Sequence, residues 1–316
     1  MCAHNNGDDV PHGTIAAAQN PLQIVGHLAI WATGYSVGVA IILGEFLVRP
    51  IGFLALAYVA LCAHSGYLFD RVKFRDADLD PADLMADPDR HLFLRRFSRS
   101  IRILMVVEWI GAVAVGGVIS PVLGAVVIGG IVAGYVYSGW RPMAGGRWVR
   151  LKDIAGFKAV MVGGAVVGLG LIAVLGEALP RSFGALGRVG DVAGGVPWIL
   201  IVGMLVMVCG DAVICDLDDQ ESDEKYRTRS LPVMIGMRRS ALVASGLLVT
   251  GGLMVALDAG ENVQARALFA GMAVVSGLGI MRQGKDFGGR RDWIDGRMLM
   301  VVICVMIVNN YWIIVE

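Results

Sequence analysis

Residues 197–223 read PWILIVGMLVMVCGDAVIC and then DLDDQESD, so an apolar stretch of 19 residues ends at Cys215 and acidic residues begin at Asp216. An α-helix rises about 1.5 Å per residue, so such a stretch covers roughly 28 Å, close to the ~30 Å hydrocarbon core of a bilayer. The sequence therefore predicts a membrane-spanning helix that delivers a run of carboxylates to one membrane surface.

Eight other stretches of the chain are similarly apolar and of similar length. We therefore predict an all-α fold, a polytopic membrane helical bundle with about nine transmembrane helices around a central cavity. The tight turn at 119–121 leaves open that two stretches form a single re-entrant pair. The predicted spans are 23–44, 51–70, 103–119, 121–138, 154–175, 197–215, 240–257, 266–281 and 296–315.

The composition of the chain also indicates a membrane protein. Of 316 residues, 56% are hydrophobic and 17% charged, whereas soluble proteins carry roughly 25% charged residues. A formal net charge of zero gives no electrostatic reason to expect nucleic acid. Among the 43 glycines, the pairs Gly130/Gly134 and Gly164/Gly168 have a spacing that predicts close helix packing in lipid.

The distribution of basic residues predicts how the bundle is oriented, because Lys and Arg near helix ends stay cytoplasmic. With the N-terminus inside, the inside segments hold 22 of the 27 Lys and Arg residues and the outside loops hold four. We expect an integral protein of the bacterial inner membrane whose long polar segments, 71–100 and 216–239, both face the cytoplasm. We divide the chain into a polar cytoplasmic tail, 1–22, and a single transmembrane domain, 23–316.

Three acids after the sixth predicted span share one helix face if the helix continues. Asp216, Asp219 and Asp223 are spaced i, i+3 and i+7. Three like charges on one stripe repel each other, and a divalent cation would neutralise them. Mg²⁺ binds one or two protein carboxylates and fills its other positions with water and phosphate oxygens. The stripe thus predicts a metal-diphosphate site, with a solvated helix end as the alternative interpretation.

A second acidic pair follows the second predicted span. Asp76 and Asp80 are spaced i, i+4 and lie 143 residues before Asp219 and Asp223. Both pairs come just after an even-numbered span, so we expect the two acidic segments on the same side of the membrane. Membrane bundles often build a site between two such halves.

With these motifs the chain resembles the UbiA superfamily of intramembrane prenyltransferases. That family has nine helices and two Asp-rich motifs, NDxxDxxxD after the second helix and DxxDxxxD after the sixth. The second motif is matched by Asp216, Asp219 and Asp223, and by a Ser-Leu-Pro-Val at 230–233 where the family has Thr-Leu-Pro-Val. The segment 150–158, RLKDIAGFK, also resembles the family's segment between helices four and five.

The first motif departs from the family pattern. If Asp76 and Asp80 are its last two acids, Val72 and Lys73 occupy the usual Asn and Asp positions, while Pro88-Asp-Arg90 resembles the downstream PDRP of the family. We prefer this register because it keeps a DxxxD pair. It puts one of the two magnesium sites in doubt, and the charge of Lys73 is a candidate substitute for a cation.

Two other registers of the first motif stay open. One places Asp70 at the middle acid, and the other places the acids at Asp80, Asp83 and Asp87.

The resemblance implies a Mg²⁺-dependent transfer of an isoprenyl group, within the membrane, from a prenyl diphosphate to a lipophilic or aromatic acceptor that the residues do not identify. It implies that five acids bind the metal and take part in catalysis, that five basic residues bind the diphosphate, and that four more residues are uncertain candidates. The acids are Asp76, Asp80, Asp216, Asp219 and Asp223; the basic residues are Arg90, Arg150, Lys152, Lys158 and Arg229; the uncertain residues are Asp70, Lys73, Tyr137 and Asp211.

Two other functions are compatible with the motifs. A UbiA-type terpene cyclase would ionise the same kind of donor with the same acids. A non-catalytic lipid binder or transporter is favoured by the eroded first motif. The DGxxAR signature of CDP-alcohol phosphotransferases, another class of membrane enzyme with Asp-rich magnesium chemistry, is absent from the sequence.

Overall fold

The computed structural model describes residues 21–74, 87–138, 154, 156–178, 196–226, 229–257, 263–283 and 290–315, and these ranges contain helices and no strand. The helices confirm the predicted all-α class. They are α1 (Pro21–His27), α2 (Ile30–Phe46), α3 (Phe53–Val72), α5 (Pro88–Arg96), α6 (Ser98–Ile119), α7 (Pro121–Ser138), α8 (Phe157–Val174), the short 3₁₀ turn η3 (Gly176–Ala178), α10 (Trp198–Asp218), α11 (Gln220–Tyr226), α12 (Leu231–Ile235), α13 (Met237–Leu257), α14 (Val263–Gln283) and α15 (Arg290–Val315).

The long helices follow the predicted apolar stretches in order. Six of them, α3, α6, α8, α10, α13 and α14, are long and apolar enough to cross a membrane, and α2, α7 and α15 contain shorter apolar segments. The first predicted span is broken, because Ala29 adopts a left-handed conformation (φ 58°) between α1 and α2. The turn at 119–121 separates two full helices at Ser120, and Pro121 begins the second, a position where the missing N–H costs nothing.

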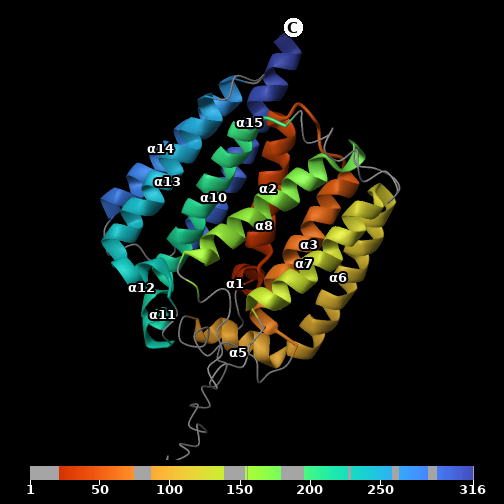
Figure 1. Cartoon of the computed structure of the whole chain (residues 1–316), viewed down its shortest axis with the longest axis vertical. Helices are drawn as coiled ribbons and strands as arrows, with labels where there is room; N and C mark the ends of the chain where they lie inside the picture. The colour runs from red at the N-terminus through yellow and green to blue at the C-terminus, as the bar shows by residue number, and fades with distance from the viewer. Residues whose placement is uncertain are drawn as a thin grey trace, which may run out of the picture.

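Four helices form the centre of the bundle. Helix α2 contacts α8 and α15, and α10 contacts the same two helices, so the four close a ring of neighbours. Helices α13 and α14 pack on one side of this group, and α3, α6 and α7 pack on the other (Figure 1). The short helices α1, α5, α11 and α12 lie together at one end, called the α11 end below, while the C-terminus lies at the opposite end.

The closest helix packing occurs at glycines other than the four that the spacing predicted, although a Cβ on one of these, Gly134 of α7, would lie 3.7 Å from the ring of Phe69 of α3. A Cβ added to Gly251 of α13 would lie 2.6 Å from the backbone oxygen of Gly203 of α10, so these two helices touch through their backbones. By contrast, a Cβ on Gly130, Gly164 or Gly168 would meet no described atom within 4 Å. The prediction of close packing at these three glycines was therefore wrong, because a small-xxx-small spacing permits contact on a face without selecting that face.

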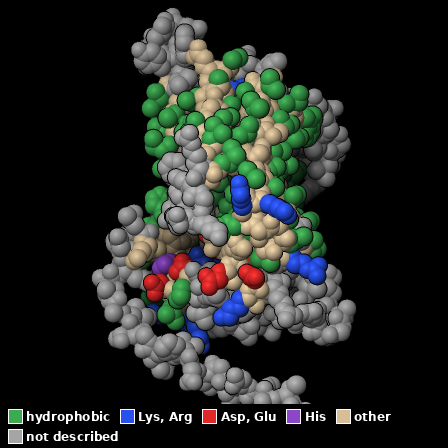
Figure 2. All heavy atoms as spheres, turned by 90° about the vertical axis from the view of Figure 1, so that its left-hand side faces the viewer, with side chains coloured by type: hydrophobic (Ala, Val, Ile, Leu, Met, Phe, Trp, Pro, Cys, Tyr) green, Lys and Arg blue, Asp and Glu red, His purple; other side chains and the backbone are tan. Residues whose placement is uncertain are grey.

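The surface of the bundle is apolar over most of its length. Figure 2 shows hydrophobic side chains covering the upper part of one face, with acidic and basic side chains gathered in the lower part, toward the α11 end. Several large apolar side chains outside the core are highly exposed, including Ile110, Val118 and Leu257. A bilayer would cover such a band, whereas the charged end would lie at the membrane surface.

Candidate active site

The three acids of the second motif lie on two nearly continuous helices. Helix α10 ends at Asp218, Asp219 is its C-terminal cap, and α11 begins at Gln220. The backbone N–H of Asp223 donates to the carbonyl oxygen of Asp219 at 2.9 Å, so a helical hydrogen bond bridges the break. The helix thus continues nearly as the spacing of the acids requires.

Burial separates these acids from the other charged residues of the segment. Asp216 and Asp223 are 3% and 6% exposed, and Asp219 is half-buried, whereas Asp218 and Glu224 are exposed. A solvated helix end would leave its acids in water. Burial of two carboxylates instead indicates a site, because buried charges need a partner.

Lys158 of α8 is one such partner. Its Nζ forms an ion pair with Oδ1 of the buried Asp216, and it also interacts electrostatically with Asp219 and Asp223. Lys158 follows Gly156, whose φ of 69° begins the first turn of α8. The structure therefore brings one predicted diphosphate-binding residue to the three predicted metal-binding acids.

The residues present fit a divalent cation. Three carboxylates and one ammonium carry a net charge of −2, and Oδ2 of Asp223 is buried without a hydrogen-bond donor among the described residues. The pKa of Asp223 is raised to about 6, mainly by burial; Lys158 and Ser230 lower the pKa, and the neighbouring Asp219 and Asp216 raise it. Within the described ranges no group of three Asp, Glu, His or Cys side chains is arranged to hold a metal ion by itself, but Mg²⁺ needs only one or two protein carboxylates and takes its other ligands from water and phosphate oxygens.

The C-terminal end of α3 carries Asp70 and Lys73, two of the candidates for the first motif that the structure describes. Lys73 is buried, has a φ of 53°, and donates from Nζ to Oδ1 of Asp70 at 2.8 Å. Arg102 of α6 donates to the carbonyl oxygens of Lys73 at 3.0 Å and Val72 at 3.4 Å, which caps the helix end. Lys73 therefore has a carboxylate partner on its own helix.

Four predicted site residues lie outside the described residues: Asp76, Asp80, Arg150 and Lys152. Their predicted roles stay predictions.

The structure places three further predicted residues on α5, on α7 and just before α12. Arg90 is buried at the start of α5 and forms an ion pair with Asp87 at 3.4 Å, and Asp87 also caps that helix by accepting from the backbone N–H of Arg90 at 3.0 Å. Arg229 is exposed between α11 and α12, and Tyr137 is half-buried in the last turn of α7.

Asp211, which the sequence left uncertain, forms a buried cluster with two residues that sequence reasoning missed. Arg297 of α15 donates from Nη2 to its Oδ1 at 2.6 Å and to its Oδ2 at 2.5 Å, and the hydroxyl of Tyr35 of α2 donates to Oδ2 at 2.7 Å. A charged Arg297 beside an apolar stretch was the available signal, since ionisable residues inside a membrane are usually paired and functional.

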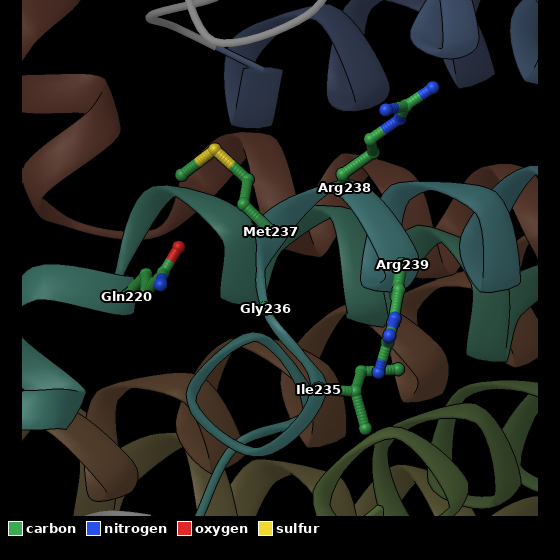
Figure 3. A pocket seen from close by; sticks show the side chains of 6 residues that line it. All are labelled: Gln220, Ile235, Gly236, Met237, Arg238 and Arg239. Carbon is green, nitrogen blue, oxygen red and sulfur yellow. The ribbon is translucent and has the colours of Figure 1, made fainter.

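A groove of about 700 Å³ lies beside α11, at the corner where α12 meets α13. It is lined by Gln220, Ile235, Gly236, Met237, Arg238 and Arg239. Figure 3 shows the two arginine side chains pointing in different directions from the start of α13. The groove contains none of the three acids, so we do not assign it to the candidate active site.

Comparison with known proteins gives the family. Residues 27–292 match the family model of the UbiA prenyltransferase family. The chain belongs to that family. The assignment confirms the resemblance of the motifs, and with the apolar helices it identifies an integral membrane protein from a family of prenyltransferases. No curated protein matches the sequence significantly.

Solved structures of UbiA homologues share the fold. An apo UbiA homologue from Aeropyrum pernix K1 superimposes with a TM-score of 0.57 and 16% identity, over 88% of this chain and 98% of the homologue. A UbiA homologue from Archaeoglobus fulgidus bound to DMAPP and Mg²⁺ gives 0.56 and 15%, over 90% and 96%. A UbiA homologue from Archaeoglobus fulgidus bound to GPP and Mg²⁺ gives 0.58 and 16%, over 89% and 98%.

Proposed function

We propose that this UbiA-family protein catalyses the Mg²⁺-dependent transfer of an isoprenyl group from a prenyl diphosphate to a lipophilic or aromatic acceptor within the membrane. The observation that carries the proposal is the pair of buried carboxylates, Asp216 and Asp223, beside Lys158 at the charged end of an apolar bundle. The Archaeoglobus fulgidus homologue, which binds a prenyl diphosphate with Mg²⁺, supports it.

The acidic and basic residues of the site have different proposed roles. Asp216, Asp219 and Asp223 would hold Mg²⁺, which when bound supplies positive charge to the oxygens of the leaving diphosphate. Lys158 would donate hydrogen bonds to those oxygens as negative charge develops on them. We assign the same role to Arg150 and Lys152 on the resemblance of their segment to the family.

The apolar interior has a separate task. Departure of diphosphate leaves an allylic cation on the isoprenyl chain, and water would quench it. Apolar side chains between the helices would exclude water and hold the chain beside the acceptor. A long isoprenoid tail also explains why this chemistry takes place in a membrane, with the acids at what we propose is the cytoplasmic surface of a single transmembrane domain.

The proposal is tested by incubating detergent-purified protein with Mg²⁺, a labelled isoprenyl diphosphate and a panel of phenolic, quinone-precursor and lipid acceptors. We expect Mg²⁺-dependent release of diphosphate and a labelled product, and loss of both in Asp219→Asn and Asp223→Asn. The matched control is Glu224→Gln, which neutralises an exposed acid on the same helix as Asp223 and should keep the activity of the unmodified protein.

The products also separate the alternative functions. A labelled hydrocarbon formed without any acceptor would favour a terpene cyclase. Donor binding without diphosphate release, across all donor lengths and acceptors, would contradict the transferase and favour a lipid binder or transporter.

A further inference from the structure

The buried cluster of Tyr35, Asp211 and Arg297 connects three of the four central helices. Its side chains are 6%, 2% and 7% exposed, and its hydrogen bonds measure 2.5 to 2.7 Å. They join α2, α10 and α15. The ion pair of Lys158 with Asp216 joins α10 to the fourth central helix, α8. Polar contacts therefore fix α10 to each of its partners in the central ring.

The position of the cluster along α10 relates it to the acids. Asp211 precedes Asp216 by five residues, which is about 7.5 Å along a helix axis. The two carboxylates therefore lie on the last turns of the same helix. A shift of α10 against α2 or α15 would move the carboxylates of Asp216 and Asp219 with it.

The cluster is poorly suited to reacting directly. Both oxygens of Asp211 accept hydrogen bonds, one from Arg297 alone and the other from Arg297 and Tyr35. Buried ion pairs rarely add net stability, so an ion pair at this depth needs a reason beyond stability.

We propose that Tyr35, Asp211 and Arg297 are positioning residues that hold the α11 end of α10, and thereby set the spacing of the metal-binding carboxylates. The inference rests on the proposed function, because it concerns the same acids. Groups that hydrogen-bond directly to metal ligands typically change metal affinity by about 10–100-fold when they are lost. The cluster acts on the ligands through the position of α10, so we expect an effect at the lower end of that range.

The test measures binding rather than turnover. Detergent-purified protein is titrated with Mg²⁺ in the presence of farnesyl thiodiphosphate, an analogue that ionises poorly, and the Mg²⁺ concentration at half-maximal analogue binding is recorded. The melting temperature of each variant without Mg²⁺ is measured alongside. The variants are Asp211→Asn, Arg297→Gln, the double variant and Tyr35→Phe.

The matched control is Arg266→Gln. Arg266 is also a buried arginine whose guanidinium bonds to α2, since its Nη2 donates to the carbonyl oxygen of Phe46 at 2.8 Å. Phe46 ends α2 at the end of the bundle opposite the acids. The control therefore removes a comparable tie to α2 far from the acids, so it should lower the melting temperature and leave the Mg²⁺ midpoint unchanged.

We expect Asp211→Asn and Arg297→Gln each to raise the Mg²⁺ midpoint by about tenfold, and Tyr35→Phe to raise it less. The double variant should change it by less than the product of the single changes, because it leaves no unpaired buried charge. If Asp211→Asn or Arg297→Gln does not fold, the Mg²⁺ midpoints of Tyr35→Phe and of the double variant test the inference instead.

Suppose that the unmodified protein binds the analogue in a Mg²⁺-dependent way, but that all four variants have the same Mg²⁺ midpoint as Arg266→Gln. That result would overturn the inference and leave the proposed function intact. An unmodified protein that binds no analogue at any Mg²⁺ concentration would overturn both.

Discussion

Asp223 is a buried carboxylate, and its protonation should make the stability of the folded protein depend on pH. Its pKa is raised to about 6 by burial, whereas an exposed Asp titrates near 3.9. The folded protein therefore holds this proton at pH values where the unfolded chain has lost it. The resulting stabilisation is complete below about pH 4 and is lost as the pH rises through 6.

Without metal, the melting temperature of the unmodified protein should therefore fall between pH 5 and pH 7 by more than the melting temperature of Asp223→Asn falls over the same range. Added Mg²⁺ should remove the difference at pH 7, since a cation neutralises the carboxylate. Differential scanning fluorimetry of the two proteins in detergent measures this, and equal pH dependence in both would contradict the assignment.

Lys158 provides a second prediction, because its ammonium forms an ion pair with Asp216. Lys158→Gln should lower kcat/KM for the donor by about 100-fold, the usual loss for one group that stabilises developing charge. Lys158→Arg keeps the charge and should retain much more activity. Steady-state kinetics of both variants would contradict the role if they were equally impaired or equally active.

Sequence spacing was sufficient to predict that the three acids lie close together. It was insufficient to predict the buried cluster of Tyr35, Asp211 and Arg297. Asp216, Asp219 and Asp223 lie within eight residues, so helical periodicity alone places them together. Tyr35 and Arg297 lie 176 and 86 residues from Asp211. Contacts between single polar residues of separate spans follow no local pattern, and only the packing of the helices brings them together.

The contact between α10 and α13 depends on glycine. A Cβ on Gly251 would lie 2.6 Å from the oxygen of Gly203 and 2.7 Å from the nitrogen of Met207, both backbone atoms. Gly251→Ala should therefore force the helices apart and cost about 1–3 kcal/mol. Gly164→Ala, at an open position of α8, should cost nothing and can stabilise the helix by up to about 1 kcal/mol.

Thermal unfolding of the two glycine variants in the same detergent checks this prediction. Equal melting temperatures would show that the two helices do not pack through their backbones.

Hydropathy predicted the long helices to within several residues, since the length of an apolar stretch is a local property of the chain. It did not predict the break at Ala29. His64 of α3 hydrogen-bonds to the carbonyl oxygen of Leu28 at 2.8 Å beside this break, so a distant helix satisfies a backbone group that the break exposes. Such compensation depends on tertiary contacts that hydropathy does not record.

The orientation of the whole bundle rests on its charge asymmetry and can be tested by labelling. In a background without the native cysteines, Val263→Cys at the exposed start of α14 should react with a membrane-impermeant maleimide in intact cells. Glu224→Cys at the α11 end should react only after the membrane is permeabilised. The opposite pattern would place the acids outside the cytoplasm.

The fold class and the family were predictable because hydropathy and the second motif both act over short ranges of sequence. The arrangement of α2, α8, α10 and α15 as a central ring was not, because apolar helices of similar length give no signal about which of them are neighbours. The partnership of the second motif with Asp76 and Asp80 stays a prediction.

The central claim is that the buried acids hold a metal ion against a prenyl diphosphate. Its most direct test replaces Mg²⁺ with paramagnetic Mn²⁺, in the presence of farnesyl thiodiphosphate, and records the phosphorus hyperfine coupling by electron-nuclear double resonance. We predict coupling in the unmodified protein and in Glu224→Gln, and its loss in Asp219→Asn and Asp223→Asn. Bound Mn²⁺ without phosphorus coupling, or coupling that survives both Asp variants, would contradict the account.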